Sequence, residues 1–173
     1  MKSIIPRLTL FAALVAASCV VQARQDPLHE HHDATAAAPL VSQLQLDGGK
    51  RWATDAALRS GMAQIRAAFD AEHPRIHAAQ ETNAQYATLA ATIEVSVNGI
   101  VAQCKLPPAA DAQLHFVIGD LLQGVALMRG SDPQRSRHDG AALVHGALRA
   151  YPKFFEDAAW RTESVPDAHA APR

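Results

Sequence analysis

The sequence predicts an all-α protein, an antiparallel up-down-up-down four-helix bundle. Between residues 58 and 155, four segments repeat apolar residues every three or four positions, the spacing that places side chains on one face of a helix. None shows the two-residue alternation of a half-buried strand, and short connections make successive helices antiparallel neighbours. The positions that share this spacing are Leu58, Met62, Ile65, Phe69, His73 and Ile76; Tyr86, Leu89, Ile93, Val97, Ile100 and Cys104; Leu114, Ile118, Leu121, Val125 and Met128; and Ala141, Val144, Leu148, Tyr151 and Phe155.

Capping residues mark where three of these helices should begin. Thr54 and Asp55 precede the first segment as cap and acidic residue, and Thr82 can cap the second. Asp132 followed by Pro133 fits an N-cap and first helical residue for the fourth segment. These positions predict starts near residues 55, 83 and 133.

Prolines set the expected ends. The run Lys-Leu-Pro-Pro at 105–108 should stop the second helix, because proline lacks an amide donor and restrains the residue before it. By the same argument we expect Pro74 either to kink the first helix or to end it at His73. Pro152 should bend or break the fourth helix near Tyr151.

The amino-terminal 23 residues predict export to the periplasm. Lys2 and Arg7 supply a positive start, residues 8–15 an apolar stretch too short to span a membrane, and residues 21–23 a small-x-small cleavage site. An alternative takes Cys19 as the acylated residue of a degenerate lipoprotein signal, although the alanine at the first position of that motif favours soluble export.

The rest of the chain divides into three expected parts: a flexible arm that contains histidines at 24–49, the helical bundle at 50–160, and a disordered tail at 161–173. Removing the signal leaves 14 basic against 17 acidic residues, a net charge near −3, so no basic surface is available for nucleic acid. All nine histidines survive cleavage. Cys104 is then the one remaining cysteine, so the exported chain cannot form an internal disulfide.

Four residues suggest a transition-metal site within the bundle. If the three connections are centred near residues 81, 107 and 131, Met62, His115 and His145 lie at about the same height along the bundle axis. Cys104 then lies about one helical turn from that height. Thioether, imidazole and thiolate together suit copper, and imidazole with thiolate also suits zinc. A simpler interpretation treats Cys104 as a small core residue and the histidines as structural.

A second candidate metal site lies in the arm. His29, His31 and His32 alternate with two carboxylates within five residues, and neutral imidazoles of this kind can capture copper or a divalent ion. The arm could collect an ion and pass it to the bundle. It could equally be a solvated linker with incidental histidines.

The third segment, from Leu114 to Leu122, resembles the corresponding helix of cytochrome b562, a periplasmic four-helix haem protein. The resemblance implies Met62 as an axial haem ligand. That family's second ligand is a histidine near the end of the last helix, after a tyrosine, where this chain has Pro152 after Tyr151. Proline cannot ligate iron, and no Cys-x-x-Cys-His is present for covalent attachment.

Two further blocks resemble small exported proteobacterial proteins of unsettled function, sometimes labelled DnrO-like. They are Lys-Arg-Trp-Ala-Thr-Asp at 50–55, and Cys-Lys-Leu-Pro-Pro-Ala-Ala-Asp at 104–111, which leads to Leu114 and His115. This resemblance implies a common structural design without an activity.

Three functions follow as hypotheses. The first is a non-enzymatic periplasmic bundle that binds or buffers copper or zinc, since catalytic serine, phosphate-loop and His-Glu-x-x-His motifs are missing from the sequence. The second is a haem-binding electron carrier related to cytochrome b562. The third is a structural bundle that binds another periplasmic protein through its aromatic residues, which are Trp52, Tyr151, Phe154, Phe155 and Trp160.

Overall fold

The computed structural model describes residues 38–160, and this part of the chain contains four α-helices and no strand of a sheet. A short 3-10 helix, η1 (Leu40–Gln43), comes first. The four helices confirm the predicted fold class. They are α1 (Ala56–His77), α2 (Asn83–Gln103), α3 (Pro108–Met128) and α4 (Arg137–Phe154).

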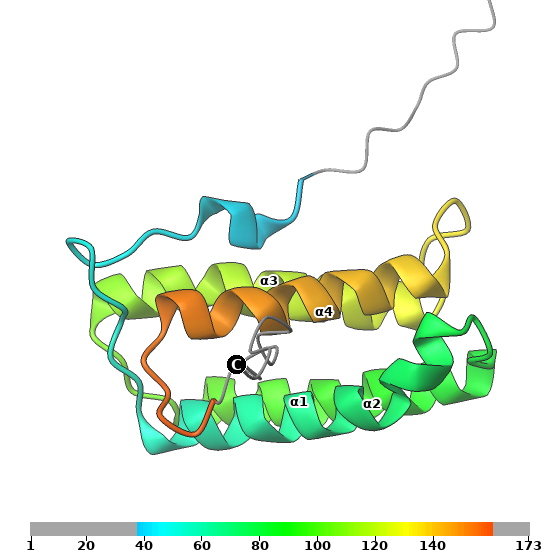
Figure 1. Ribbon diagram of the computed structural model, residues 1–173, viewed down its shortest axis with the longest axis horizontal. Coiled ribbons are helices and arrows are strands. Elements are labelled where there is room, and N and C mark those ends of the chain that lie inside the picture. The colour runs from blue at the N-terminus through cyan, green and yellow to red at the C-terminus, as the bar shows by residue number, and fades with distance from the viewer. Residues whose placement is uncertain (1–37, 161–173) are drawn as a thin grey trace, which may run out of the picture. The chain divides into compact units, whose positions relative to one another are not determined.

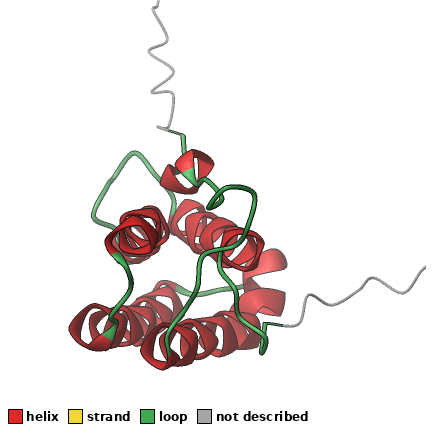
Figure 2. Ribbon diagram, turned by 90° about the vertical axis from the view of Figure 1, so that its left-hand side faces the viewer, coloured by secondary structure: helices red, strands yellow, loops and turns green. Residues whose placement is uncertain are grey.

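The helices form two layers, with α1 beside α2 and α3 beside α4 (Figures 1 and 2). Contacts between α2 and α3 and between α4 and α1 close the arrangement. Connections of four to eight residues, together with the near-parallel axes in Figure 1, give the antiparallel order that the sequence predicted.

The predicted apolar spacing agrees closely with the observed core. Every residue of the four segments is buried except His73 and Cys104, which are both half-buried. Phe69, Tyr151 and Phe155 are the largest of the nearly inaccessible side chains. Full burial of one such aromatic side chain contributes roughly 1.5–3 kcal/mol, so this core supplies most of the stabilisation of the bundle.

One of the three predicted caps is confirmed, since Thr82 forms a capping box at the start of α2. The cap of α1 is Asp55 and not Thr54, one residue later than predicted, and its carboxylate accepts from the amide of Leu58 at 2.7 Å. Helix α4, however, begins after Ser136, which forms a capping box with Asp139. Asp132 instead accepts from a backbone amide two residues later within the connecting turn.

The prolines affect the helices differently from one another. The 105–108 run ends α2 at Gln103, as predicted. Helix α1 nevertheless continues through Pro74 to His77, so the expected end at His73 is wrong, and α4 continues past Pro152 to Phe154. A proline near a helix end removes one backbone hydrogen bond, a loss that burial of Ile76 and Phe155 offsets.

Part of the expected flexible arm is packed onto the bundle. The buried carboxylate of Asp120 on α3 accepts from the amides of Leu40 and Val41, at 2.8 and 2.9 Å. Leu44 joins the core. Ordered structure therefore begins before residue 50, and η1 lies along α3 and α4.

The aromatic residues close one end of the bundle. Tyr151 stacks on Phe155 with ring centres 5.4 Å apart and contacts Trp160 at 4.9 Å. The amide of Trp52 donates to the carbonyl of Phe154 at 2.7 Å, which ties the chain before α1 to the end of α4. Most of this aromatic surface therefore completes the core. Within residues 38–160, no helix is long and apolar enough to cross a membrane.

A histidine cluster between α1 and α4

The structure does not bring the four predicted bundle ligands to one point. Met62 is completely buried in the core, whereas the side chain of His115 is 72% exposed and its Nδ1 donates to the Asp111 carbonyl at 2.8 Å. Cys104 follows the last residue of α2 and contacts the carboxylate of Asp55. His145 lies elsewhere, on α4.

The height of each residue explains the separation. Cys104 is level with Asp55, at the start of α1, whereas His145 packs against Phe69. Fourteen residues separate these two positions on α1, which corresponds to about 21 Å at ~1.5 Å per residue. This separation is far larger than the one helical turn that the sequence predicted between Cys104 and the level of His145, because small errors in three assumed turns and in helix tilt accumulate around the bundle.

Cys104 and His115 do share a surface hollow of about 170 Å³ between α2 and α3. Asp111 also lines it. Burial, with the nearby carboxylates of Asp55 and Asp111, raises the pKa of the Cys104 thiol to about 11. The thiol is protonated at neutral pH, which makes it a small, weakly polar residue packed against the core.

A different group of histidines converges between α1 and α4. The ring centres of His73 and His145 are 5.0 Å apart, and those of His73 and His77 are 6.2 Å apart. His73 and His77 are one helical turn apart on α1, and His145 reaches them from α4. Phe69 stacks against His145 at 5.4 Å and supports its ring from the core side. We refer to His73, His77 and His145 as the histidine cluster.

The cluster is accessible, and the imidazole of His145 favours the neutral form. His77 is exposed, while His73 and His145 are half-buried. Burial lowers the pKa of His145, and the nearby His73 and Arg149 lower it further, against a smaller opposing effect of Asp70. A neutral imidazole has a free nitrogen lone pair, which is the form that ligates a metal. With the side chains as they stand, no group of three or more His, Cys, Asp or Glu residues within residues 38–160 is placed to hold a metal ion.

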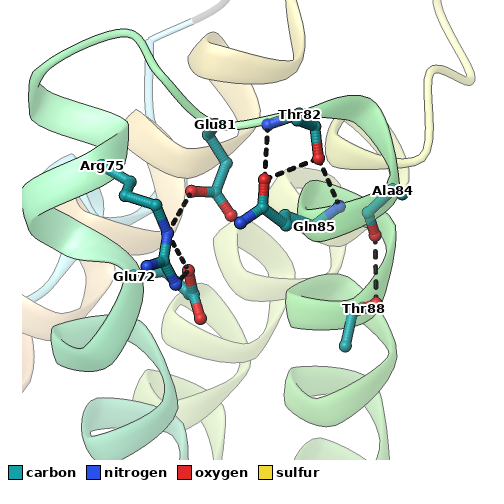
Figure 3. Close-up of polar contacts among 7 residues, drawn as sticks. All are labelled: Glu72, Arg75, Glu81, Thr82, Ala84, Gln85 and Thr88. Atoms are coloured by element: carbon teal, nitrogen blue, oxygen red, sulfur yellow. Dashed lines mark hydrogen bonds and ion pairs between the residues drawn. The ribbon is translucent and has the colours of Figure 1, made fainter.

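A second polar group lies in the connection between α1 and α2 (Figure 3). Arg75 forms an ion pair with Glu72 and a looser ion pair, at 3.5 Å, with the carboxylate of Glu81 (Figure 3). The Glu81 side chain is fully buried and neither of its oxygens has a hydrogen-bond partner. Burial raises the pKa of Glu81, and the charge of Glu72 adds to this effect against the opposing charge of Arg75. Burial also raises the pKa of the neighbouring Tyr86, and the charge of Glu81 raises it further.

Sequence reasoning did not identify His73 and His77 as candidate ligands. Their spacing, His-x-x-x-His within one predicted helix, was the available signal, because residues four apart lie on the same helix face. The arm histidines His29, His31 and His32, together with Cys19, lie outside the described residues. Comparison of the chain with protein-family models, curated proteins and solved structures found no match.

Proposed function

We propose that this protein is a non-enzymatic periplasmic bundle that binds or buffers a transition metal, copper first and zinc second, at the histidine cluster. The spacing of the imidazoles is the observation that carries the proposal. Two imidazoles that ligate one ion through nitrogen–metal bonds of ~2 Å have ring centres about 5–6 Å apart. The 5.0 Å between His73 and His145 fits this requirement, and the 6.2 Å between His73 and His77 is slightly above it.

Binding needs only side-chain rotation. His77 is exposed and His73 half-exposed, so both rings can turn without moving the backbone of α1. His145 has less freedom because its ring lies against Phe69. The ion would therefore lie on the outer side of the contact between α1 and α4, with His145 as the fixed ligand.

The donor set favours copper(II) or zinc over copper(I). Imidazole suits both divalent ions, and copper(II) binds nitrogen sites more tightly than zinc does. The soft sulfur ligands that motivated copper(I), Met62 and Cys104, contribute nothing to this cluster. Three ligands on a solvent-facing surface leave a coordination position for water or for a ligand from the arm, which suits exchange and buffering.

Isothermal titration of the purified protein with copper(II) and zinc, and with copper(I) under anaerobic conditions, tests the proposal. We expect one site in the bundle that retains its affinity when residues 24–37 are deleted. His145→Gln should weaken binding at least ~10-fold, since even the loss of an outer-shell partner costs that much. Binding no tighter than micromolar would refute the function.

His115→Gln is the matched control. His115 is also a surface imidazole on a bundle helix, but it is bonded to its own helix and lies outside the cluster. It should leave the affinity unchanged. Equal losses in His115→Gln and His145→Gln would locate binding somewhere other than the cluster, and a loss confined to Cys104→Ser would point to the hollow between α2 and α3.

A further inference from the structure

The outer surface of the α1 and α2 layer carries a long uncharged groove. Two adjoining hollows, of about 560 and 270 Å³, share Gln64, Val95 and Ser96 as lining residues. None of the residues that line either hollow is charged, and most are small. We refer to this combined surface as the α1–α2 groove.

Val95 stands at the junction of the two hollows with 72% of its surface exposed. Helix α2 contains a single charged residue, Glu94, and this carboxylate is paired with Arg129 of α3 at 2.6 and 3.0 Å. The pairing holds the one charge of α2 on its α3 side. The groove therefore combines an exposed apolar residue, small neighbours that allow close approach of another helix, and a face without charge.

We infer that the α1–α2 groove is the interface of a homodimer. A second copy meets this face with the same neutral surface, so association neither buries an unpaired charge nor opposes like charges. In a two-fold arrangement, each copy would place Val95 in or beside the hollow of its partner, which is the self-complementary contact that such symmetry requires.

The size of the face sets the expected affinity. Helices of this length are about 30 Å long, and two side by side are about 20 Å wide, so the whole outer face of the layer, of which the groove is part, offers at most roughly 600 Å² per copy. The total of about 1,200 Å² is at the lower limit of specific protein interfaces. We therefore expect a dimer that dissociates in the micromolar range.

The groove is independent of the proposed metal site. The histidine cluster lies between α1 and α4, whereas the groove lies between α1 and α2, so one inference can fail while the other holds.

Sedimentation analysis from low micromolar to near-millimolar protein tests the dimer, with circular dichroism to confirm that each variant is folded. Val95→Glu should yield a monomer at every concentration. Val101→Glu is the matched control, because Val101 is 68% exposed on the same helix but lines the hollow near Cys104. It should dimerise as the unmodified protein does.

A second disruptive variant, Ala91→Arg, guards against an effect peculiar to position 95, since Ala91 is exposed and also lines the groove. It should likewise yield a monomer. A protein that stays monomeric at the highest concentration would overturn the inference and leave the groove to a different partner. Equal disruption by Val95→Glu and Val101→Glu would overturn it too, because the contact would not follow the groove.

Discussion

Gly124 should be far less tolerant of alanine than its position in the middle of a helix indicates. A Cβ atom added to Gly124 would lie 2.6 Å from the carbonyl oxygen of Gly140 and 2.7 Å from a methyl group of Val144, where α3 crosses α4. A backbone carbonyl cannot rotate away as a side chain can. Gly124→Ala therefore forces the two helices apart, and overpacking of this kind costs about 1–3 kcal/mol.

Helix propensity opposes this cost. Alanine is favoured over glycine by about 1 kcal/mol within a helix, so the net destabilisation at position 124 should be about 0–2 kcal/mol. Gly146→Ala isolates the propensity term, because an added Cβ on this residue of α4 meets nothing within 4 Å. It should stabilise the protein by up to ~1 kcal/mol. The difference between the two variants, about 1–3 kcal/mol, is the packing cost alone.

Gly119→Ala provides an intermediate case. Its added Cβ would lie 2.5 Å from the end of the Leu40 side chain, which can move. Equilibrium urea unfolding followed by far-ultraviolet circular dichroism should rank the variants by stability as Gly146→Ala, Gly119→Ala and Gly124→Ala. Gly124→Ala as stable as Gly146→Ala would refute the argument, since α3 and α4 would then not be held at backbone contact.

Two other substitutions test the polar groups. Asp120→Ala removes the acceptor for two backbone amides and should lower the free energy of unfolding by about 1–3 kcal/mol. Hydrogen exchange should become faster at those two amides alone, and unchanged exchange would contradict the role assigned to Asp120. Glu81→Gln should stabilise the protein by about 1 kcal/mol at neutral pH, because a buried carboxylate without a hydrogen bond is replaced by a neutral amide. Because the pKa of Glu81 is raised, the folded state holds this proton more tightly than the unfolded state does. The loss of folding stability that the buried carboxylate causes is therefore present above the raised pKa, and it disappears as the pH falls below the ordinary pKa of a glutamate. The stability gained by Glu81→Gln should accordingly vanish at about pH 4. If Glu81→Gln instead lowers stability at neutral pH, the attraction between Glu81 and Arg75 outweighs the cost of burying the carboxylate.

The core of this fold was predictable because burial depends on a local pattern. Spacing of three and four residues determines which side of a helix is apolar, and that side faces the other helices whatever their tilt. Capping was predictable where one polar residue stood at the boundary, as at Thr82, and it was one residue off where Thr54 and Asp55 stood side by side. It failed at Asp132 because Ser136, four residues later, had its own partner in Asp139.

The candidate site was less predictable because it depends on how helices are rotated and how far they slide past one another. His115 and His145 both flank an apolar stripe, yet His115 is exposed on α3, while His145 turns toward Phe69. A rotation of one residue, about 100°, separates these outcomes. The pair His73 and His77 needed no such information, because both residues belong to one helix.

Metal binding at the histidine cluster should be linked to folding. His145 comes from α4 and the other two ligands come from α1, so the three imidazoles meet only when the bundle is formed. A ligand present at ~100 times its dissociation constant stabilises the state that binds it by about 2.7 kcal/mol. His29, His31 and His32 are neighbours in sequence, so ions bound there would be held equally in the folded and unfolded chain. Copper or zinc should therefore raise the midpoint of thermal unfolding in protein that lacks residues 24–37, and His145→Gln should abolish the increase. No increase in protein that lacks residues 24–37, or an increase that survives His145→Gln, would refute a metal site assembled by α1 and α4, because only a site that needs both helices binds the folded chain in preference to the unfolded one.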